Sequence, residues 1–181
     1  MTIWKNGQFF EDTWIFAGEG DVPAGDVVLG VEALETLAAQ DHAGKLGLDV
    51  HPGDDMDAIA ALLAKVDLVV VNFPAFSDGR AFSLARLIRE KYGFEGDIRA
   101  KGAFILDQMP MLERCGVTSF DISSEAVATG LRRGDWPDMP RYYQHALDGE
   151  GATSRIRAVD PKRPWLSVNV AGENIYERTA A

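Results

Sequence analysis

The sequence has few of the residues that build metal and redox centres. Cysteine occurs once, as Cys115, and the three histidines are His42, His51 and His145. One thiol excludes an internal disulfide, and it excludes a cluster or zinc site built from several thiolates of this chain. The histidines lack metal-ligand spacing. We therefore expect no intrinsic iron–sulfur or zinc site, and any other cofactor is unknown at this stage.

Long apolar segments are also missing. None approaches the roughly 20 residues that cross a bilayer, and the N-terminus lacks the apolar core of a signal peptide. These absences favour a cytoplasmic protein without a membrane partner. Hydrophobic residues make up 46% of the chain and charged residues 25%, as in ordinary globular proteins. The length of 181 residues suits one domain with a sizeable core.

Basic residues are scarce in the first part of the chain. The net charge is −10, and residues 1–77 hold 3 basic and 13 acidic side chains. Such a segment is either a solvated surface or a docking face for a basic protein partner. The negative sign argues against nucleic acid as a partner. A homodimer is an open alternative.

Short apolar runs alternate with helical patterns through the middle of the chain. The expected strands cover residues 27–29, 46–50, 68–72, 97–101 and 119–122, and the expected helices cover residues 32–40, 56–66, 82–92, 107–115 and 125–133. Three of these helices have a cation in the last turn and a glycine just beyond the end, which is typical of a helix C-terminus. The alternation predicts a mostly parallel sheet of about five βα units. This sheet is either open and doubly wound or a partial barrel. We favour the open sheet because a full barrel needs eight units.

The flanking segments have patterns of their own. Asn6-Gly7 tolerates positive φ and predicts an N-terminal hairpin, which a short strand at residues 13–16 follows. After Gly134 we expect a short helix at 141–147, a loop at 148–164 and one strand at 165–170. We assign residues 1–148 to a single α/β domain. Residues 149–181 form a C-terminal extension that is packed on the domain or partly flexible.

Charged residues follow two of the expected strands, at the edge where open α/β sheets bind ligands. Arg80 comes after the Asp78-Gly79 turn, and Arg99 and Lys101 point to the same side of one strand. These three cations, with Gln108 in the following loop, would favour a small oxyanion such as sulfite, sulfate or a phosphate. The pattern therefore predicts an anion site at strand ends.

The carboxylates near these cations have two interpretations. Asp78 caps a helix and pairs with Arg99 or Arg86 in the structural interpretation, and Asp107 caps the next helix. In the catalytic interpretation, Asp78 and Asp107 are the acid–base groups of an enzyme. The sequence leaves both open.

Motifs of established catalytic chemistry are absent. No glycine-rich dinucleotide or phosphate-binding fingerprint occurs, and Ser83 lacks the context of a nucleophile elbow. Cys115 lies at a helix C-terminus, where the dipole disfavours a thiolate, so we expect a packed small hydrophobe. His51 follows a strand and is read as a turn residue, with a base role as the alternative.

Three blocks of sequence carry a resemblance to a known family. They read F-P-x-F-x-D-G-R-x-F-S-L-A-R-x-x-R, D-I-R-A-x-G and D-Q-x-x-x-L-x-R-x-G. They resemble an uncharacterised bacterial domain-of-unknown-function family whose members are described as oxidoreductases of sulfite reduction. The resemblance covers Leu46 to Phe120, and Tyr143-Gln144 is similar to a later Y-Q of the family. The matching residues are Asp78, Gly79, Arg80, Ser83, Arg86, Arg99, Gly102, Asp107, Gln108 and Arg114.

The resemblance implies a role in sulfur assimilation but assigns no catalytic residue. Genes of the family lie beside those of sulfite reductase and adenylylsulfate reductase, so either reductase is an expected partner. Six-electron reduction of sulfite needs a haem-type centre and an iron–sulfur cluster, which one cysteine cannot hold. We expect an accessory protein of sulfate and sulfite reduction that binds sulfite, sulfate or a nucleotide sulfate. The alternatives are an oxidoreductase or other enzyme that uses Asp78 or Asp107, and an α/β interaction module without a small ligand.

Overall fold

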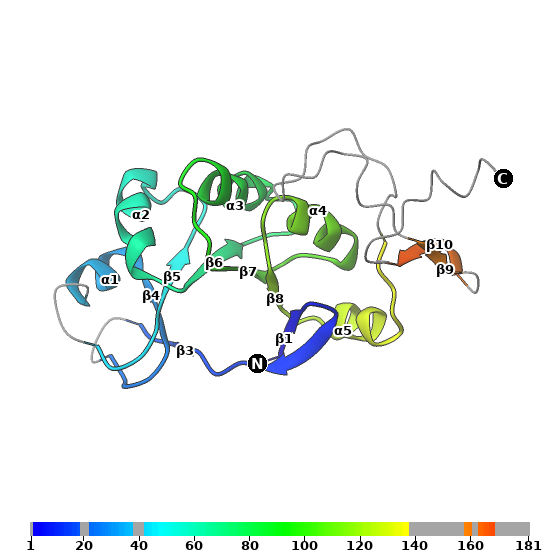
Figure 1. Ribbon diagram of the computed structural model, residues 1–181, viewed down its shortest axis with the longest axis horizontal. Coiled ribbons are helices and arrows are strands. Elements are labelled where there is room, and N and C mark those ends of the chain that lie inside the picture. Colours follow the sequence, from blue (N-terminus) through cyan, green and yellow to red (C-terminus); the bar gives the residue numbers. More distant parts are fainter. Residues whose placement is uncertain (1, 19–21, 38–41, 138–157, 161–162, 169–181) are drawn as a thin grey trace.

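One curled sheet organises the molecule (Figure 1). The computed structural model describes residues 2–18, 22–37, 42–137, 158–160 and 163–168. The eight strands of the sheet are β1 (Thr2–Lys5), β2 (Gln8–Glu11), β3 (Ile15–Phe16), β4 (Val27–Gly30), β5 (Leu46–Val50), β6 (Leu68–Phe73), β7 (Asp97–Gly102) and β8 (Ser119–Asp121). Their order is β2-β1-β8-β7-β6-β5-β4-β3. Strands β3 to β8 are parallel, and β1 is antiparallel to both β2 and β8.

Helices follow the parallel strands in turn. They are α1 (Val31–Leu37), α2 (Met56–Leu62), α3 (Arg80–Glu90), α4 (Met109–Arg114) and α5 (Glu125–Arg132), with short 3₁₀ turns η1 (Leu63–Lys65) and η2 (Leu106–Gln108). The strands and helices expected between residues 27 and 133 are thus confirmed, with ends that differ by a few residues. For the helix expected at 32–40 this holds as far as Leu37, and residues 38–40 lie outside the described residues. The sheet is not a simple set of five parallel units, because β3 adds a parallel strand and β1 and β2 add an antiparallel pair.

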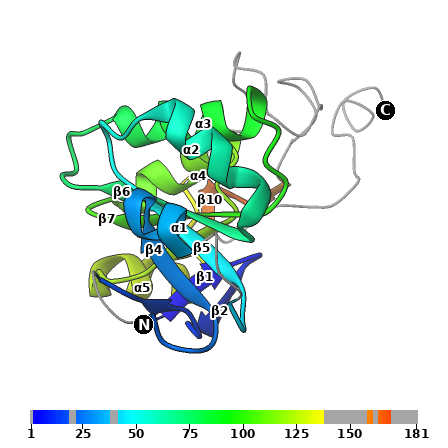
Figure 2. The ribbon, with the colours of Figure 1, turned by 90° about the vertical axis from the view of Figure 1, so that its left-hand side faces the viewer.

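The strand order decides between the two predicted arrangements. Neighbouring parallel strands follow one another in the chain, so right-handed crossovers place their helices on the same face. Figures 1 and 2 show α2, α3 and α4 along one side of the sheet. A doubly wound sheet would need a reversal of strand order, with helices on both faces. The favoured open sheet is therefore wrong, and the alternative, a partial barrel, is correct.

The curl of the sheet follows from the chain between its two edge strands. Only three residues separate β2 from β3, so an extended chain spans at most about 14 Å between the two edges. Seven strand spacings in a flat sheet would place those edges about 34 Å apart. The sheet therefore bends into a half-barrel. We call residues 12–16, which cross its concave side, the strap.

The strap carries a small apolar core of its own. Trp14 and Phe16 pack against Val28, Leu68 and Val70, which point to the concave side of the sheet. The larger core lies on the convex side, between the strands and the helices. Both faces of the central strands are thus covered, which explains their nearly continuous apolar sequence.

The backbone angles in the turns agree with the sequence prediction. Asn6 and Gly7 have φ of 50° and 79° in the predicted hairpin. Gly93, Gly116 and Gly134 have positive φ just after α3, α4 and α5. These angles confirm the predicted hairpin and the predicted glycine positions at three helix ends.

The C-terminal part is described only at a second, two-stranded sheet. Strands β9 (Ala158–Asp160) and β10 (Arg163–Val168) pair antiparallel. Strand β9 lies in the stretch predicted as loop, whereas β10 overlaps the predicted strand. The predicted helix at 141–147 lies outside the described residues, and the division at residue 148 stays a prediction. Among the described residues, no helix has the length and apolar character needed to cross a membrane.

Candidate functional site

Polar side chains gather where β5 to β8 end on the concave face. Their neighbours along each strand, such as Leu48, Val71 and Phe120, belong to the core beneath the helices. Because strand residues alternate between faces, the intervening side chains point to the concave side. We call Asp49, Asn72, Lys101 and Asp121 the strand-end row. Carboxyl ends of parallel strands are the usual ligand-binding edge of α/β barrels and sheets.

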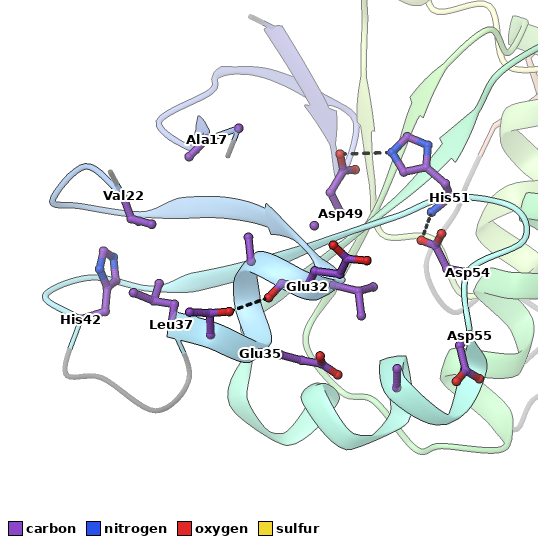
Figure 3. Close-up of a pocket in the computed structure, with 16 residues that line it drawn as sticks. Ala17, Val22, Glu32, Glu35, Leu37, His42, Asp49, His51, Asp54 and Asp55 are labelled. Atoms are coloured by element: carbon purple, nitrogen blue, oxygen red, sulfur yellow. Dashed lines mark hydrogen bonds and ion pairs between the residues drawn. The ribbon is translucent and has the colours of Figure 1, made fainter. Parts of the chain in front are cut away.

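The row borders an open hollow beside β3, β4 and β5 (Figure 3). Its volume is about 1270 Å³, and its lining includes Gly18, Glu32, Asp49, His51 and Asp55. The lining is rich in carboxylates, so it favours neutral or cationic groups over anions. The hollow by itself is therefore unsuited to holding an oxyanion.

A chain of side chains connects the hollow to the row. His51 Nε2 lies 3.5 Å from Asp49 Oδ2, and the His51 backbone N–H donates to Asp54 at 2.7 Å. Asn72 Nδ2 donates to Asp49 Oδ1 and to the Val50 carbonyl. The carboxylate that faces His51 is thus fixed by an amide on the next strand. An imidazole beside a carboxylate can act as a proton acceptor, so His51 has a candidate role beyond the turn expected from the sequence.

Lys101 is the cation of the row. Its Nζ lies 3.4 Å from the centroid of the Phe16 ring, on the strap. Its backbone pairs in register with that of Asn72. Among the residues that the structure describes, no carboxylate forms an ion pair with Lys101. The ammonium group is therefore held by an aromatic face and retains its hydrogen-bond donors for a ligand.

Asp121 is the buried acid of the row, with 3% of its surface exposed. Burial raises its pKa above the ordinary value of 3.8, an effect that Asp12 reinforces and that Lys101 and Arg99 oppose. Burial dominates because a charged carboxylate loses its hydration. Asp121 therefore holds a proton more readily than an exposed aspartate, and the protonated carboxyl group is a hydrogen-bond donor.

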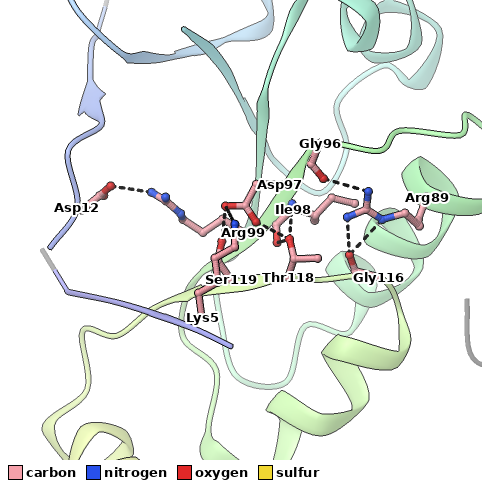
Figure 4. A network of polar contacts seen from close by, with 10 residues as sticks. All are labelled: Lys5, Asp12, Arg89, Gly96, Asp97, Ile98, Arg99, Gly116, Thr118 and Ser119. Atoms are coloured by element: carbon pink, nitrogen blue, oxygen red, sulfur yellow. Dashed lines mark hydrogen bonds and ion pairs between the residues drawn. The ribbon is translucent and has the colours of Figure 1, made fainter. Parts of the chain in front are cut away.

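Below the row, Arg99 forms an ion pair with Asp12 of the strap (Figure 4). The distance from Arg99 Nη1 to Asp12 Oδ1 is 3.0 Å, and the two side chains are only 5% and 2% exposed. Arg99 Nε and Asp12 Oδ2 are buried, and neither has a hydrogen-bond partner among the described residues. The pair thus neutralises both charges but leaves part of its hydrogen-bonding capacity unused.

Arg80 has a different partner. Its guanidinium group donates to Asp78, with Nη2 2.7 Å from Oδ2, and the Arg80 backbone N–H donates to the same carboxylate at 3.1 Å. These hydrogen bonds lower the pKa of Asp78 to about 2. Asp78 therefore stabilises the start of α3, as expected, but it pairs with Arg80, and the predicted pairs with Arg99 or Arg86 are wrong. Arg86 pairs with Glu90.

The predicted cap Asp107 is replaced by its neighbour. Gln108 Oε1 accepts a hydrogen bond from the Ile105 N–H at 3.1 Å, and its Nε2 donates to the Phe76 carbonyl at 3.3 Å. Gln108 thus links the loops after β6 and β7. Asp107 is exposed in the first turn of η2.

Cys115 is buried, as the sequence predicts. Burial raises the pKa of its thiol, an effect that Arg86 and Arg114 oppose. A raised pKa keeps a thiol protonated and unreactive at neutral pH. The described residues contain no group of three or more His, Cys, Asp or Glu side chains suited to a metal ion.

The structure therefore brings together two of the three predicted cations. Arg99 and Lys101 share the concave face of β7, whereas Arg80 is engaged by Asp78 at the start of α3. The sequence analysis did not identify Asp49, Asn72 and Asp121. The sequence pattern that could have identified them is a polar residue near the end of an apolar strand, on the face that Lys101 also occupies.

Comparisons with known proteins give a family and no function. No curated protein matches the sequence. The family model described as "Bacterial protein of unknown function (DUF934)" matches residues 47–153, which include β6, α3, β7 and the whole strand-end row. Since this match covers more than half of the chain, the protein belongs to this bacterial family of unknown function.

Proposed function

We propose that the protein binds a small oxyanion at the strand-end row, with Lys101 as the principal contact. The observation that carries this proposal is the position of Lys101 Nζ, 3.4 Å from the Phe16 ring centroid and without a carboxylate ion pair among the described residues. The ammonium group can donate charge-assisted hydrogen bonds to an oxyanion. The site lies at the edge where parallel sheets bind ligands.

The class of oxyanion comes from the resemblance of the sequence to a family of sulfite reduction. We infer that the ligand is sulfite, sulfate or a nucleotide sulfate, and that the protein is a cytoplasmic accessory factor of assimilatory sulfate reduction. A sulfite reductase or an adenylylsulfate reductase would then supply the redox centre, because a single cysteine cannot hold an iron–sulfur cluster. The acidic N-terminal part is the proposed docking face for this partner.

Titration calorimetry tests the binding proposal. The full-length protein is titrated with sulfite, sulfate and adenosine 5′-phosphosulfate, and the Lys101→Met variant is compared with Lys91→Met. Lys91 is a matched control because it is an exposed lysine whose Nζ lies 4.9 Å from the centroid of the Tyr92 ring. We expect Lys101→Met to weaken binding about tenfold or more, the loss of a charge-assisted hydrogen bond. Absence of binding by the wild type, or equal binding by both variants, would refute the proposal.

An enzyme of the same pathway is the second candidate, and the His51–Asp49–Asn72 chain favours it. Asp78 is a weak proton acceptor because its pKa is about 2, so His51 replaces it as the candidate base. A strain that lacks the gene would be complemented with His51→Gln or with the control His42→Gln. His42 also lines the hollow, but it bonds the Gly25 carbonyl. Full complementation by His51→Gln would remove this candidate.

A further inference from the structure

The strap covers both cations that β7 presents on the concave face. Asp12 pairs with Arg99, and Phe16 lies against Lys101. Arg99 and Lys101 are two residues apart on one strand, so an anion at the end of β7 could contact both. In the structure, a carboxylate of the chain itself holds the deeper of the two positions.

We propose that Asp12 is a displaceable internal ligand, and that an oxyanion binds Arg99 and Lys101 together when the strap withdraws. This inference rests on the proposed function of the strand-end row and specifies how that site opens. The ligand class is a sulfite- or sulfate-like oxyanion, which has more acceptor atoms than a carboxylate.

The hydrogen bonding of the buried pair supports this exchange. Arg99 contacts Asp12 through Nη1, while Arg99 Nε and Asp12 Oδ2 are buried without partners among the described residues. A guanidinium group forms its strongest contacts through two parallel hydrogen bonds. An oxyanion with three or four oxygens can use Nε as well as Nη1, and it can still reach the ammonium group of Lys101.

The charges on the concave face argue that the strap must move. Two acids, Asp12 and Asp121, interact with the two cations Arg99 and Lys101, and a third acid, Asp49, lies on the same face. A sulfate dianion added to this set would leave excess negative charge in a buried region, which is costly. Departure of Asp12 removes one negative charge and frees Arg99.

The strap is attached by few backbone contacts. Strand β3 has two residues and lies at the edge of the sheet. The Ile15 N–H donates to the Asp26 carbonyl at 2.9 Å, and the Ala17 N–H donates to the Val28 carbonyl at 3.0 Å. Short edge segments open at lower free energy than central strands. Separation of the strap from β4 breaks these two hydrogen bonds and the packing of Trp14 and Phe16 on Val28, Leu68 and Val70, so the closed strap is the more populated state. We expect the strap to open before the central strands do.

The first test compares affinities for sulfate and sulfite. A closed strap reduces the apparent affinity by the fraction of open molecules. We therefore expect Asp12→Asn to bind sulfate about tenfold more tightly than the wild type, and Asp12→Asn/Arg99→Met to lose this gain. Glu11→Gln is the matched control, because Glu11 is an exposed neighbour in β2. It should bind as the wild type does.

The second test uses the wild type, so it stands even if Asp12→Asn fails to fold. Hydrogen exchange is followed at the Ile15 and Ala17 amides with and without saturating sulfate. We expect sulfate to accelerate exchange at these two amides and to leave the amides of β6 unchanged. Equal affinities of wild type and Asp12→Asn, with slower exchange in the strap, would overturn the inference while the proposed function stands. Failure of every variant to bind any oxyanion would overturn both.

Discussion

The convex face of the sheet meets the helices through one large apolar core, whereas the concave face meets the strap through a small apolar cluster and two specific pairs. On the convex side, residues such as Leu48, Val71 and Phe120 are buried in one continuous core. On the concave side, Asp12 meets Arg99, and Phe16 meets Lys101. Apolar burial is non-directional, so many sequences would satisfy the first face. The second face depends on individual partners, as binding sites do.

The largest expected effect is on the convex side. Phe120 is 1% exposed and lies between Phe104 and Trp136, with ring centroids 5.9 and 6.5 Å away. Phe120→Ala removes a large side chain from a packed core, so we expect the free energy of unfolding to fall by about 3–5 kcal/mol. Urea denaturation measures this value. A loss below about 1 kcal/mol would show that the convex core is loosely packed at β8.

Removal of one partner of the concave ion pair should have a comparable effect, but by a different cause. Arg99→Met or Asp12→Leu leaves an unpaired buried charge, which costs about 3–5 kcal/mol. The double variant Arg99→Met/Asp12→Leu contains neither charge, so no buried charge is left unpaired. We therefore expect it to be more stable than either single variant, in the same urea experiment. If the losses of unfolding free energy in the two single variants added up in the double variant, Asp12 and Arg99 would contribute independently. That result would contradict their description as a coupled ion pair.

The positions of strands and helices could be predicted because their signals are local. Val69 and Val71 alternate with Leu68 and Val70 within one strand, and a glycine after a cation ends each of three helices. The curl could not be predicted in the same way, since it depends on which strands pair. The sequential order of β3 to β8 excludes a doubly wound sheet, and that order is a property of the assembled sheet.

The candidate site was predicted only in part, because some of its signals are local and others depend on the assembled sheet. The period of two in a strand placed Arg99 and Lys101 on one face, and the structure agrees. Their partners come from the strap, and Asp12 is 87 residues from Arg99 in the chain. No local pattern connects residues so far apart. Arg80 donates instead to Asp78, two residues away in the chain, and so it does not join the other two cations. The proposed anion-binding role remains a prediction.

A smaller effect is expected where the strap packs closely on the sheet. A Cβ atom added at Gly47 would lie 3.0 Å from Val28 Cγ2 and 3.2 Å from Trp14. Gly47→Ala should therefore lower the free energy of unfolding by about 1–3 kcal/mol, the usual cost of overpacking. Gly30→Ala is the control, because nothing lies within 4 Å of a Cβ there. Equal stabilities of the two variants would show that the strap adjusts without cost.

The smallest effect is a difference in pH dependence between Asp121 on the concave face and Asp78 at the start of α3. Burial raises the pKa of Asp121, so the folded state holds its proton more tightly than the unfolded state. Its contribution to stability is complete below the ordinary value of 3.8 and is lost as the pH rises through the raised pKa. Asp78 has the opposite sign, because Arg80 lowers its pKa to about 2. Its contribution is present above 3.8 and is lost as the pH falls towards 2.

Two conservative variants separate these contributions. Asp121→Asn should reduce the loss of stability as the pH rises above 3.8, and Asp78→Asn should reduce the loss as the pH falls below that value. Thermal denaturation of both variants and the wild type across this range measures the slopes. If both variants changed the slope of stability against pH in the same direction, burial would not be raising the pKa of Asp121. Opposite changes would tie the slope at Asp121 to burial and the slope at Asp78 to its hydrogen bonds with Arg80, because both residues are aspartates and only their surroundings differ.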